Sequence, residues 1–111
     1  MKTTLYIFDR LHELNKFTST VRDYLSSINC LQSTVSYSMY TTRGSKLLFY
    51  VNDKTVIRFT NYNLVDKCIV INSELDNDLK NELISNHLNI KFENLVLDFD
   101  DVNQIQSIIH P

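Results

Sequence analysis

The sequence predicts one α+β domain in which a mostly antiparallel sheet of five to six strands carries two to three helices on one face. Its 111 residues suit a single domain, residues 1–111. Short apolar runs typical of strands alternate with longer segments whose apolar residues recur at helical spacing. One Gly and one Pro leave little room for long irregular loops. The predicted order of elements is β-α-β-β-β-β-α-β-α.

The first strand is predicted over residues 3–8, which are rich in β-branched and aromatic side chains. Asp9 follows directly and can cap a helix. The apolar residues after it recur at spacings of three and four, which predicts one buried helical stripe. This stripe comprises Leu11, Leu14, Phe17, Val21, Leu25 and Ile28.

Three consecutive strands are predicted over residues 35–42, 45–51 and 55–60. Gly44 and the pair Asn52-Asp53 mark the turns between them, because these residue types tolerate the positive φ of tight hairpins. Two-residue turns at both places set the register. They put Met39 beside Leu48 and Tyr37 beside Tyr50.

This register assigns the side chains to two faces of the predicted sheet. The apolar face, expected to pack against the helices, comprises Val35, Tyr37, Met39, Leu48, Tyr50, Ile57 and Phe59. The other face is mixed and is either exposed or covered by the C-terminal helix. An exposed face that mixes apolar and polar residues is typical of a binding surface. Its candidate binding residues are Ser36, Ser38, Tyr40, Phe49, Arg58 and Thr60.

The remaining elements are a strand over 65–71, a helix over 73–87, a strand over 95–99 and a final helix. Ser73 is the predicted cap of the first helix, and Asp100 or Asp101 that of the second. The residues expected to point inward are Leu75, Leu79, Leu83 and Ile84 in the first helix, and Val102, Ile105 and Ile109 in the second.

Charge is unevenly distributed along the chain. Residues 1–72 hold 9 Lys and Arg against 5 Asp and Glu, whereas residues 73–111 hold 2 against 8. This uneven charge has two interpretations. One is ordinary solvated helix surface, and the other is an acidic patch that engages a basic partner. The candidate acidic surface comprises Glu74, Asp76, Asp78, Glu82, Asp98, Asp100 and Asp101.

Residues that carry catalytic or metal chemistry are scattered. His12, His87 and His110 fall on three separate elements without ligand spacing, so no metal site is expected. Cys30 and Cys68 are predicted to be buried, reduced thiols. Asp98, Asp100 and Asp101 are better explained by helix capping than by Mg²⁺ binding. The chain is therefore predicted to be a non-enzymatic, cytoplasmic protein without a cofactor, and no apolar run is long enough to span a membrane.

Two segments carry a resemblance to a known group of proteins. Ser36-Tyr-Ser-Met-Tyr40 and Val56-Ile-Arg-Phe-Thr-Asn-Tyr62 resemble a pattern in small phage- and plasmid-encoded proteins: S-x-S-x-Y, then a hairpin ending in I-R-[IV]-S-D-H. The resemblance covers about a quarter of the chain, and Thr60, Asn61 and Tyr62 stand where the pattern has Ser, Asp and His. It implies a mobile-element protein of the anti-CRISPR type, an inhibitor of a host defence factor.

The leading functional hypothesis is accordingly a small protein-binding module, phage- or virus-encoded, that blocks a host factor in the host cytoplasm by steric occupation. The acidic surface would steer it toward a basic, nucleic-acid-binding partner. Two alternatives stay open. One is a binder of single-stranded nucleic acid that uses Tyr40, Phe49 and Arg58 as a stacking platform. The other is a structural homodimer formed through the same sheet face.

Overall fold

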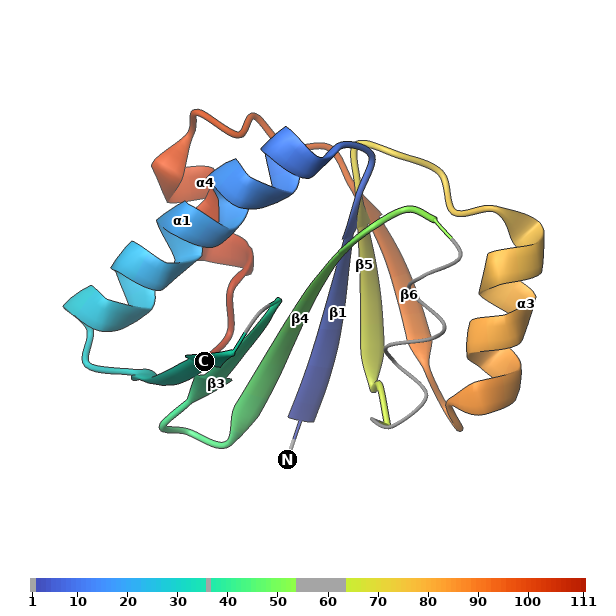
Figure 1. Ribbon diagram of the computed structural model, residues 1–111, viewed down its shortest axis with the longest axis horizontal. Coiled ribbons are helices and arrows are strands. Elements are labelled where there is room, and N and C mark those ends of the chain that lie inside the picture. Colours follow the sequence, from blue (N-terminus) through green and yellow to red (C-terminus); the bar gives the residue numbers. More distant parts are fainter. Residues whose placement is uncertain (1, 36, 54–63) are drawn as a thin grey trace.

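The computed structural model describes residues 2–35, 37–53 and 64–111, which form a six-stranded mixed sheet with helices on both sides (Figure 1). The elements are β1 (Lys2–Phe8), α1 (Leu11–Ser27), β2 (Leu31–Val35), β3 (Ser38–Thr41), β4 (Ser45–Val51), β5 (Lys67–Ile71), α3 (Asn77–Asn86), β6 (Lys91–Leu95) and α4 (Val102–Ile108). The α+β class is confirmed. Strand β2 was not predicted and the predicted strand 55–60 lies outside the described residues, so the predicted order is matched only by β1, α1, β3, β4, β5, α3, β6 and α4.

The expectation of a mostly antiparallel sheet is wrong. The strands lie in the order β2-β3-β4-β1-β5-β6. The pairs β1–β4, β1–β5 and β5–β6 are parallel, and only β3 pairs antiparallel, with β2 and with β4. The burial of β1 explains its central place: every residue from Thr3 to Phe8 is buried. A strand buried on both faces is typical of parallel sheets that are covered by helices on both sides.

The expectation that the helices share one face is also wrong. Residues of α1 and α4 pack with Tyr6 and Phe8 of β1 in one hydrophobic cluster. Leu79 and Leu83 of α3 pack with Leu5 and Ile7 of the same strand in a second cluster. Figure 1 shows α1 and α4 on one side of the sheet and α3 on the other. Because β1 is apolar on both faces, both need a helical cover.

Helix α1 buries the middle of the predicted stripe. Leu14, Phe17, Val21 and Leu25 are buried, whereas Leu11 and Ile28 at its ends are exposed. The N-cap is Arg10 rather than Asp9, and no side chain caps the helix. Burial of the four apolar residues therefore holds α1 on the sheet, since an amphipathic helix gains most of its stability from tertiary packing.

The predicted register between β3 and β4 is wrong by one residue. Met39 pairs with Leu47, not Leu48, because the hairpin loop has three residues instead of two. The loop ends at Gly44, whose φ is +85°. A three-residue hairpin loop typically closes with a residue in this left-handed region. Shifting the register by one residue moves every side chain of a strand to the opposite face relative to its partner.

The predicted apolar face consequently divides. Met39 and Leu48 are both buried but belong to clusters on opposite sides of the sheet. Val35 and Tyr37, expected inside, are 59% and 47% exposed because they lie at the tip of the outer β2–β3 hairpin. Ile57 and Phe59 lie outside the described residues.

Gly44→Ala is expected to destabilise the protein by about 1 kcal/mol through backbone strain alone. A Cβ at this position meets nothing within 4 Å, so steric crowding adds nothing. Gly44→Asn should cost less, because Asn tolerates the left-handed region better than Ala. Urea unfolding midpoints of the two variants test the order; an alanine variant as stable as the natural protein would contradict the loop geometry.

The last helices confirm one cap and correct another. Asp101 caps α4 by accepting a hydrogen bond from the Gln104 N–H at 3.1 Å. The N-cap of α3 is Asp76 rather than Ser73, so this helix begins later than predicted. Strand β6 also ends where the predicted strand 95–99 begins. Of the residues expected inside, Ile84 and Val102 are 51% and 48% exposed, while Leu79, Leu83, Ile105 and Ile109 are buried.

Candidate functional site

The predicted sheet-face site is not assembled by the described residues. Phe49 is buried under α1, with its ring stacked on Tyr6 at a centroid distance of 5.4 Å. Ser38 and Tyr40 lie on the opposite face, since they pair with Leu48 and Lys46. The Lys46 ammonium lies 5.0 Å from the centroid of the Tyr40 ring. Ser36, Arg58 and Thr60 lie outside the described residues. Phe49 is therefore unavailable as part of a stacking platform.

The parallel strands instead bring carboxylates together at one end of the sheet. Strands β4, β1, β5 and β6 are neighbours and run in the same direction, so their carboxyl ends share an edge. The described residues that directly follow these strands are 9–10, 52–53, 72–76 and 96–101. We call their acidic residues the acidic edge: Asp9, Asp53, Glu74, Asp76, Asp98, Asp100 and Asp101. Open sheets with parallel strands usually bind ligands outside this end.

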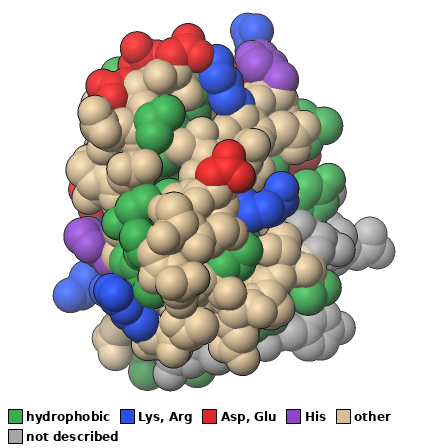
Figure 2. Space-filling view, turned by 90° about the vertical axis from the view of Figure 1, so that its left-hand side faces the viewer, with side chains coloured by type: hydrophobic (Ala, Val, Ile, Leu, Met, Phe, Trp, Pro, Cys, Tyr) green, Lys and Arg blue, Asp and Glu red, His purple; other side chains and the backbone are tan. Residues whose placement is uncertain are grey.

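All seven carboxylates of the acidic edge belong to exposed residues. Figure 2, which faces the side of α1 and α4, shows acidic side chains gathered at the top, beside basic ones. Arg10 forms an ion pair there with Asp9, at 3.7 Å, and Lys16 forms one with Asp100. Among the described residues of these segments Arg10 is the only cation, and the Lys16 side chain reaches Asp100 from α1. The acidic edge therefore keeps a net negative charge.

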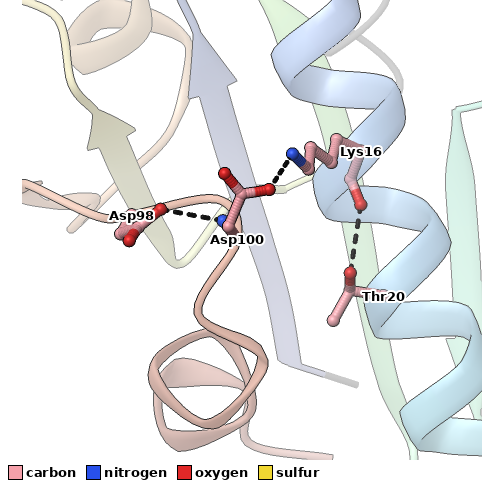
Figure 3. Close-up of polar contacts among 4 residues, drawn as sticks. All are labelled: Lys16, Thr20, Asp98 and Asp100. Carbon is pink, nitrogen blue, oxygen red and sulfur yellow. Dashed lines mark hydrogen bonds and ion pairs between the residues drawn. The ribbon is translucent and has the colours of Figure 1, made fainter.

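Local hydrogen bonds hold the part of the acidic edge between β6 and α4. Asp98 accepts a hydrogen bond from the Asp100 N–H at 2.9 Å, and the Asp100 carboxylate turns toward Lys16 on α1 (Figure 3). The Gln104 side chain accepts from the Asp98 N–H at 3.0 Å. Asp101 serves as the α4 cap. These contacts fix the loop against two helices, so its carboxylates have defined positions.

Asparagine side chains bind the neighbouring loops of this edge to each other. The Asn52 amide donates to Ser73 Oγ at 3.0 Å and to the Glu74 carbonyl at 2.9 Å. Asn72, whose φ is +52°, donates to the Leu97 carbonyl and accepts from the Leu97 N–H, both at 2.8 Å. Three of the four loops are thus cross-linked, which favours a preorganised surface over a set of independent loops.

The other two predicted acidic residues lie along α3. Asp78 and Glu82 are exposed and stand one turn apart on this helix. Like charges at this spacing destabilise a helix slightly. Within residues 2–35, 37–53 and 64–111, neither they nor Glu74 and Asp76 form an ion pair. The structure therefore divides the predicted acidic surface into the acidic edge and the α3 pair.

Asp9 and Asp53 were missed as candidates in the sequence. Each lies one or two positions after an apolar strand run, but they are separated by more than forty residues. Only the parallel pairing of β1 with β4 places them at the same edge, where the Asn52 N–H donates to the Phe8 carbonyl at 2.7 Å. The feature in the sequence that could have identified both residues is their position one or two residues after the end of a predicted strand.

Both thiols lie in the interior of the protein. Cys30 and Cys68 are buried and unbridged, as predicted. Burial raises the pKa of the Cys68 thiol to about 12, which keeps it protonated and poorly nucleophilic. Among the described residues, no group of three or more His, Cys, Asp or Glu could hold a metal ion. Their helices include none that is long and apolar enough to cross a membrane.

Comparison with known proteins adds no relative. The sequence matches no protein-family model, and searches of curated proteins and of solved structures find no significant match.

Proposed function

We propose that this chain is a non-enzymatic protein-binding module whose acidic edge docks onto a basic surface of a partner protein. The observation that carries the proposal is the gathering of seven exposed carboxylates at the carboxyl ends of four neighbouring strands, against one cation among the described residues 9–10, 52–53, 72–76 and 96–101. Charge of one sign concentrated on one surface steers a partner of opposite charge and suppresses wrong partners.

The expected contribution of these charges is to association rate and specificity. The carboxylates are exposed, so each contact with a partner cation is screened and contributes at most about 1 kcal/mol. Binding through the acidic edge should therefore weaken as salt rises, because the Debye length shortens to about 8 Å at physiological ionic strength. Apolar contacts at the same surface would have to supply the remaining affinity.

A nucleic-acid-binding protein is the partner class that fits best. Such proteins present lysine and arginine arrays spaced to contact phosphates. A fixed set of carboxylates can occupy such an array and exclude the nucleic acid sterically. Together with the resemblance to small phage- and plasmid-encoded proteins, this supports a mobile-element inhibitor of a host effector as the biological setting.

Binding to a fluorescein-labelled lysine- and arginine-rich peptide tests the proposal. Glu74→Gln with Asp76→Asn should weaken binding at low salt by about fivefold or more, since two exposed charge contacts are lost. Asn remains a good N-cap, so α3 should keep its start. Fluorescence anisotropy titrations at two salt concentrations measure the affinity.

The matched control removes two carboxylates elsewhere. Asp23→Asn on α1 with Glu82→Gln on α3 changes the net charge by the same amount, and both residues are exposed. This control should bind the peptide nearly as well as the natural protein. Equal losses in the two double variants would mean that net charge alone governs binding, and the acidic edge would then have no specific role.

A further inference from the structure

The amino ends of three strands surround a hollow of about 330 Å³ at the opposite end of the sheet from the acidic edge. It is lined by Lys2, Asp66, Lys67, Asn89 and Lys91, which we call the lysine hollow. These residues lie at or beside the starts of β1, β5 and β6, which are at the bottom of Figure 1. Its size is at the lower end of the range for small-molecule sites.

The three lysines lie on the same face of the sheet. Lys67 pairs with Lys91 across β5 and β6. Lys67 also pairs with Thr4 of β1, and Lys2 stands two positions earlier, on the same face as Thr4. Neighbouring strands are about 4.8 Å apart, so the Lys67 and Lys91 side chains begin as direct neighbours. Like charges directly opposite each other on neighbouring strands are unfavourable.

Only one of the three ammonium groups is neutralised within the described part of the chain. Lys67 Nζ forms an ion pair with Glu93 at 2.6 Å. Lys2 and Lys91 are exposed and form no ion pair there. The Asp66 carboxylate accepts a hydrogen bond from the Thr3 N–H at 2.8 Å, so its charge is partly committed to the backbone. Two cations therefore remain at the hollow without a carboxylate partner among these residues.

Backbone hydrogen bonds hold the lining in place. The Asp66 N–H donates to the Thr3 carbonyl at 2.9 Å, and the Asp66 carbonyl accepts from the Lys91 N–H at 3.1 Å. Asp66 thus connects the starts of β1 and β6 through its own backbone. The backbone that carries the three lysines is therefore fixed before a ligand binds, and this lowers the entropy cost of binding.

From this geometry we propose that the lysine hollow binds a phosphate-bearing anion of at least two negative charges. Three lysines line it, two of them without a carboxylate partner among the described residues, and no arginine lines it. Lysine is a mobile point charge that binds phosphate oxygens without a fixed geometry, so this lining selects for negative charge rather than for a planar group. The Asn89 amide adds a neutral hydrogen-bond donor. The ligand chemistry suits both a small di- or triphosphate and the backbone of a nucleic acid.

Two probes distinguish these sources. Isothermal titration calorimetry at low salt measures binding of pyrophosphate and of a short single-stranded DNA oligonucleotide to the full chain. Lys2→Gln and Lys91→Gln should each lower the affinity for the phosphate ligand by about fivefold, and the double variant by more. Binding of pyrophosphate without binding of the oligonucleotide identifies a small phosphate ligand. Binding of the oligonucleotide that is tighter than that of pyrophosphate, and that depends on the same lysines, identifies a nucleic acid.

Arg22→Gln is the matched control, because it removes one exposed positive charge from α1, outside the hollow. It should leave the pyrophosphate affinity unchanged.

Thermal unfolding without ligand gives a second readout: Lys91→Gln should unfold at the same or a slightly higher temperature, because it relieves repulsion with Lys67. Absence of binding by both probes, or equal affinity of the Lys2, Lys91 and Arg22 variants, would overturn the proposal. Neither result bears on the acidic edge, whose variants lie at the other end of the sheet.

Discussion

Phe17→Ala is expected to destabilise the protein by about 3–5 kcal/mol. Phe17 is fully buried in α1 and lies at the centre of the aromatic cluster. Its ring centroid is 5.0 Å from that of Phe8, 5.5 Å from that of Tyr6 and 6.1 Å from that of Phe49. Removing the ring deletes these contacts and leaves a cavity that the sheet beneath α1 cannot close. Such a loss is a large part of the 5–15 kcal/mol that stabilises a typical domain.

Urea unfolding followed by circular dichroism measures this loss, with an unchanged dependence on denaturant if the unfolded state is unaffected. Leu11→Ala is the matched control, since Leu11 lies on the same helix and is 52% exposed. It should cost about 0.5 kcal/mol or less. If Phe17→Ala were as mild as Leu11→Ala, α1 would not be held on the sheet through this cluster.

The positions of the elements followed from local patterns, because apolar spacing and capping residues act over a few neighbours. The stripe from Leu14 to Leu25 and the Asp101 cap are examples. Strand β2 was not predicted because it lies at the edge of the sheet. Nearly all of its residues are exposed, so its sequence shows no alternation of buried and exposed side chains. An outer strand is defined by the neighbour to which it bonds, here β3, and a sequence does not show that neighbour.

Strand direction and register depended on contacts that no local pattern encodes. The sheet was predicted to be mostly antiparallel, yet β1 lies between β4 and β5 and pairs with both in parallel. In the β3–β4 hairpin, one extra loop residue before Ser45 reversed the predicted faces. The hydroxyl of Thr41 helps to fix this loop by accepting from the Ser45 N–H at 3.0 Å. A turn with one glycine suits two- and three-residue loops alike.

The candidate site was predictable only as a list of residues. The acidic run of the last third was visible in the sequence, and its members are exposed. Their assembly with Asp9 and Asp53 required knowing that β1, β4, β5 and β6 end at the same edge. The lysine hollow was not predicted for the same reason. Lys2, Lys67 and Lys91 are far apart in sequence and come together only at the amino ends of parallel strands.

His87 is expected to make the stability depend on pH below its ordinary pKa of 6.5. The residue is 2% exposed, and its Nδ1 accepts a hydrogen bond from the Val65 N–H at 3.1 Å. A neutral imidazole that accepts at Nδ1 carries its proton on Nε2, which is buried and has no hydrogen-bond partner within the described residues. Burial lowers the pKa of His87, because it disfavours the charged form.

The direction of the effect follows from proton uptake. Between the lowered pKa of the folded protein and 6.5, the unfolded chain binds a proton at His87 that the folded chain does not bind. The unfolding free energy therefore falls as the pH drops through 6.5, by up to about 1.4 kcal/mol per pH unit, and this loss ends below the folded-state pKa. Above 6.5 the contribution of His87 is constant.

His87→Asn isolates this contribution. Asn Oδ1 occupies the position of Nδ1 along the side chain and can still accept from the Val65 N–H, but it does not titrate. Urea unfolding of both proteins between pH 5.5 and 8 gives the difference between their unfolding free energies. The carboxylates are the same in both proteins, so their titration cancels in this difference. That difference should move in favour of the Asn variant as the pH falls. A difference that stays constant over this range would mean that the buried imidazole titrates alike in the folded and unfolded chain, and that its protonation does not break the contact with Val65.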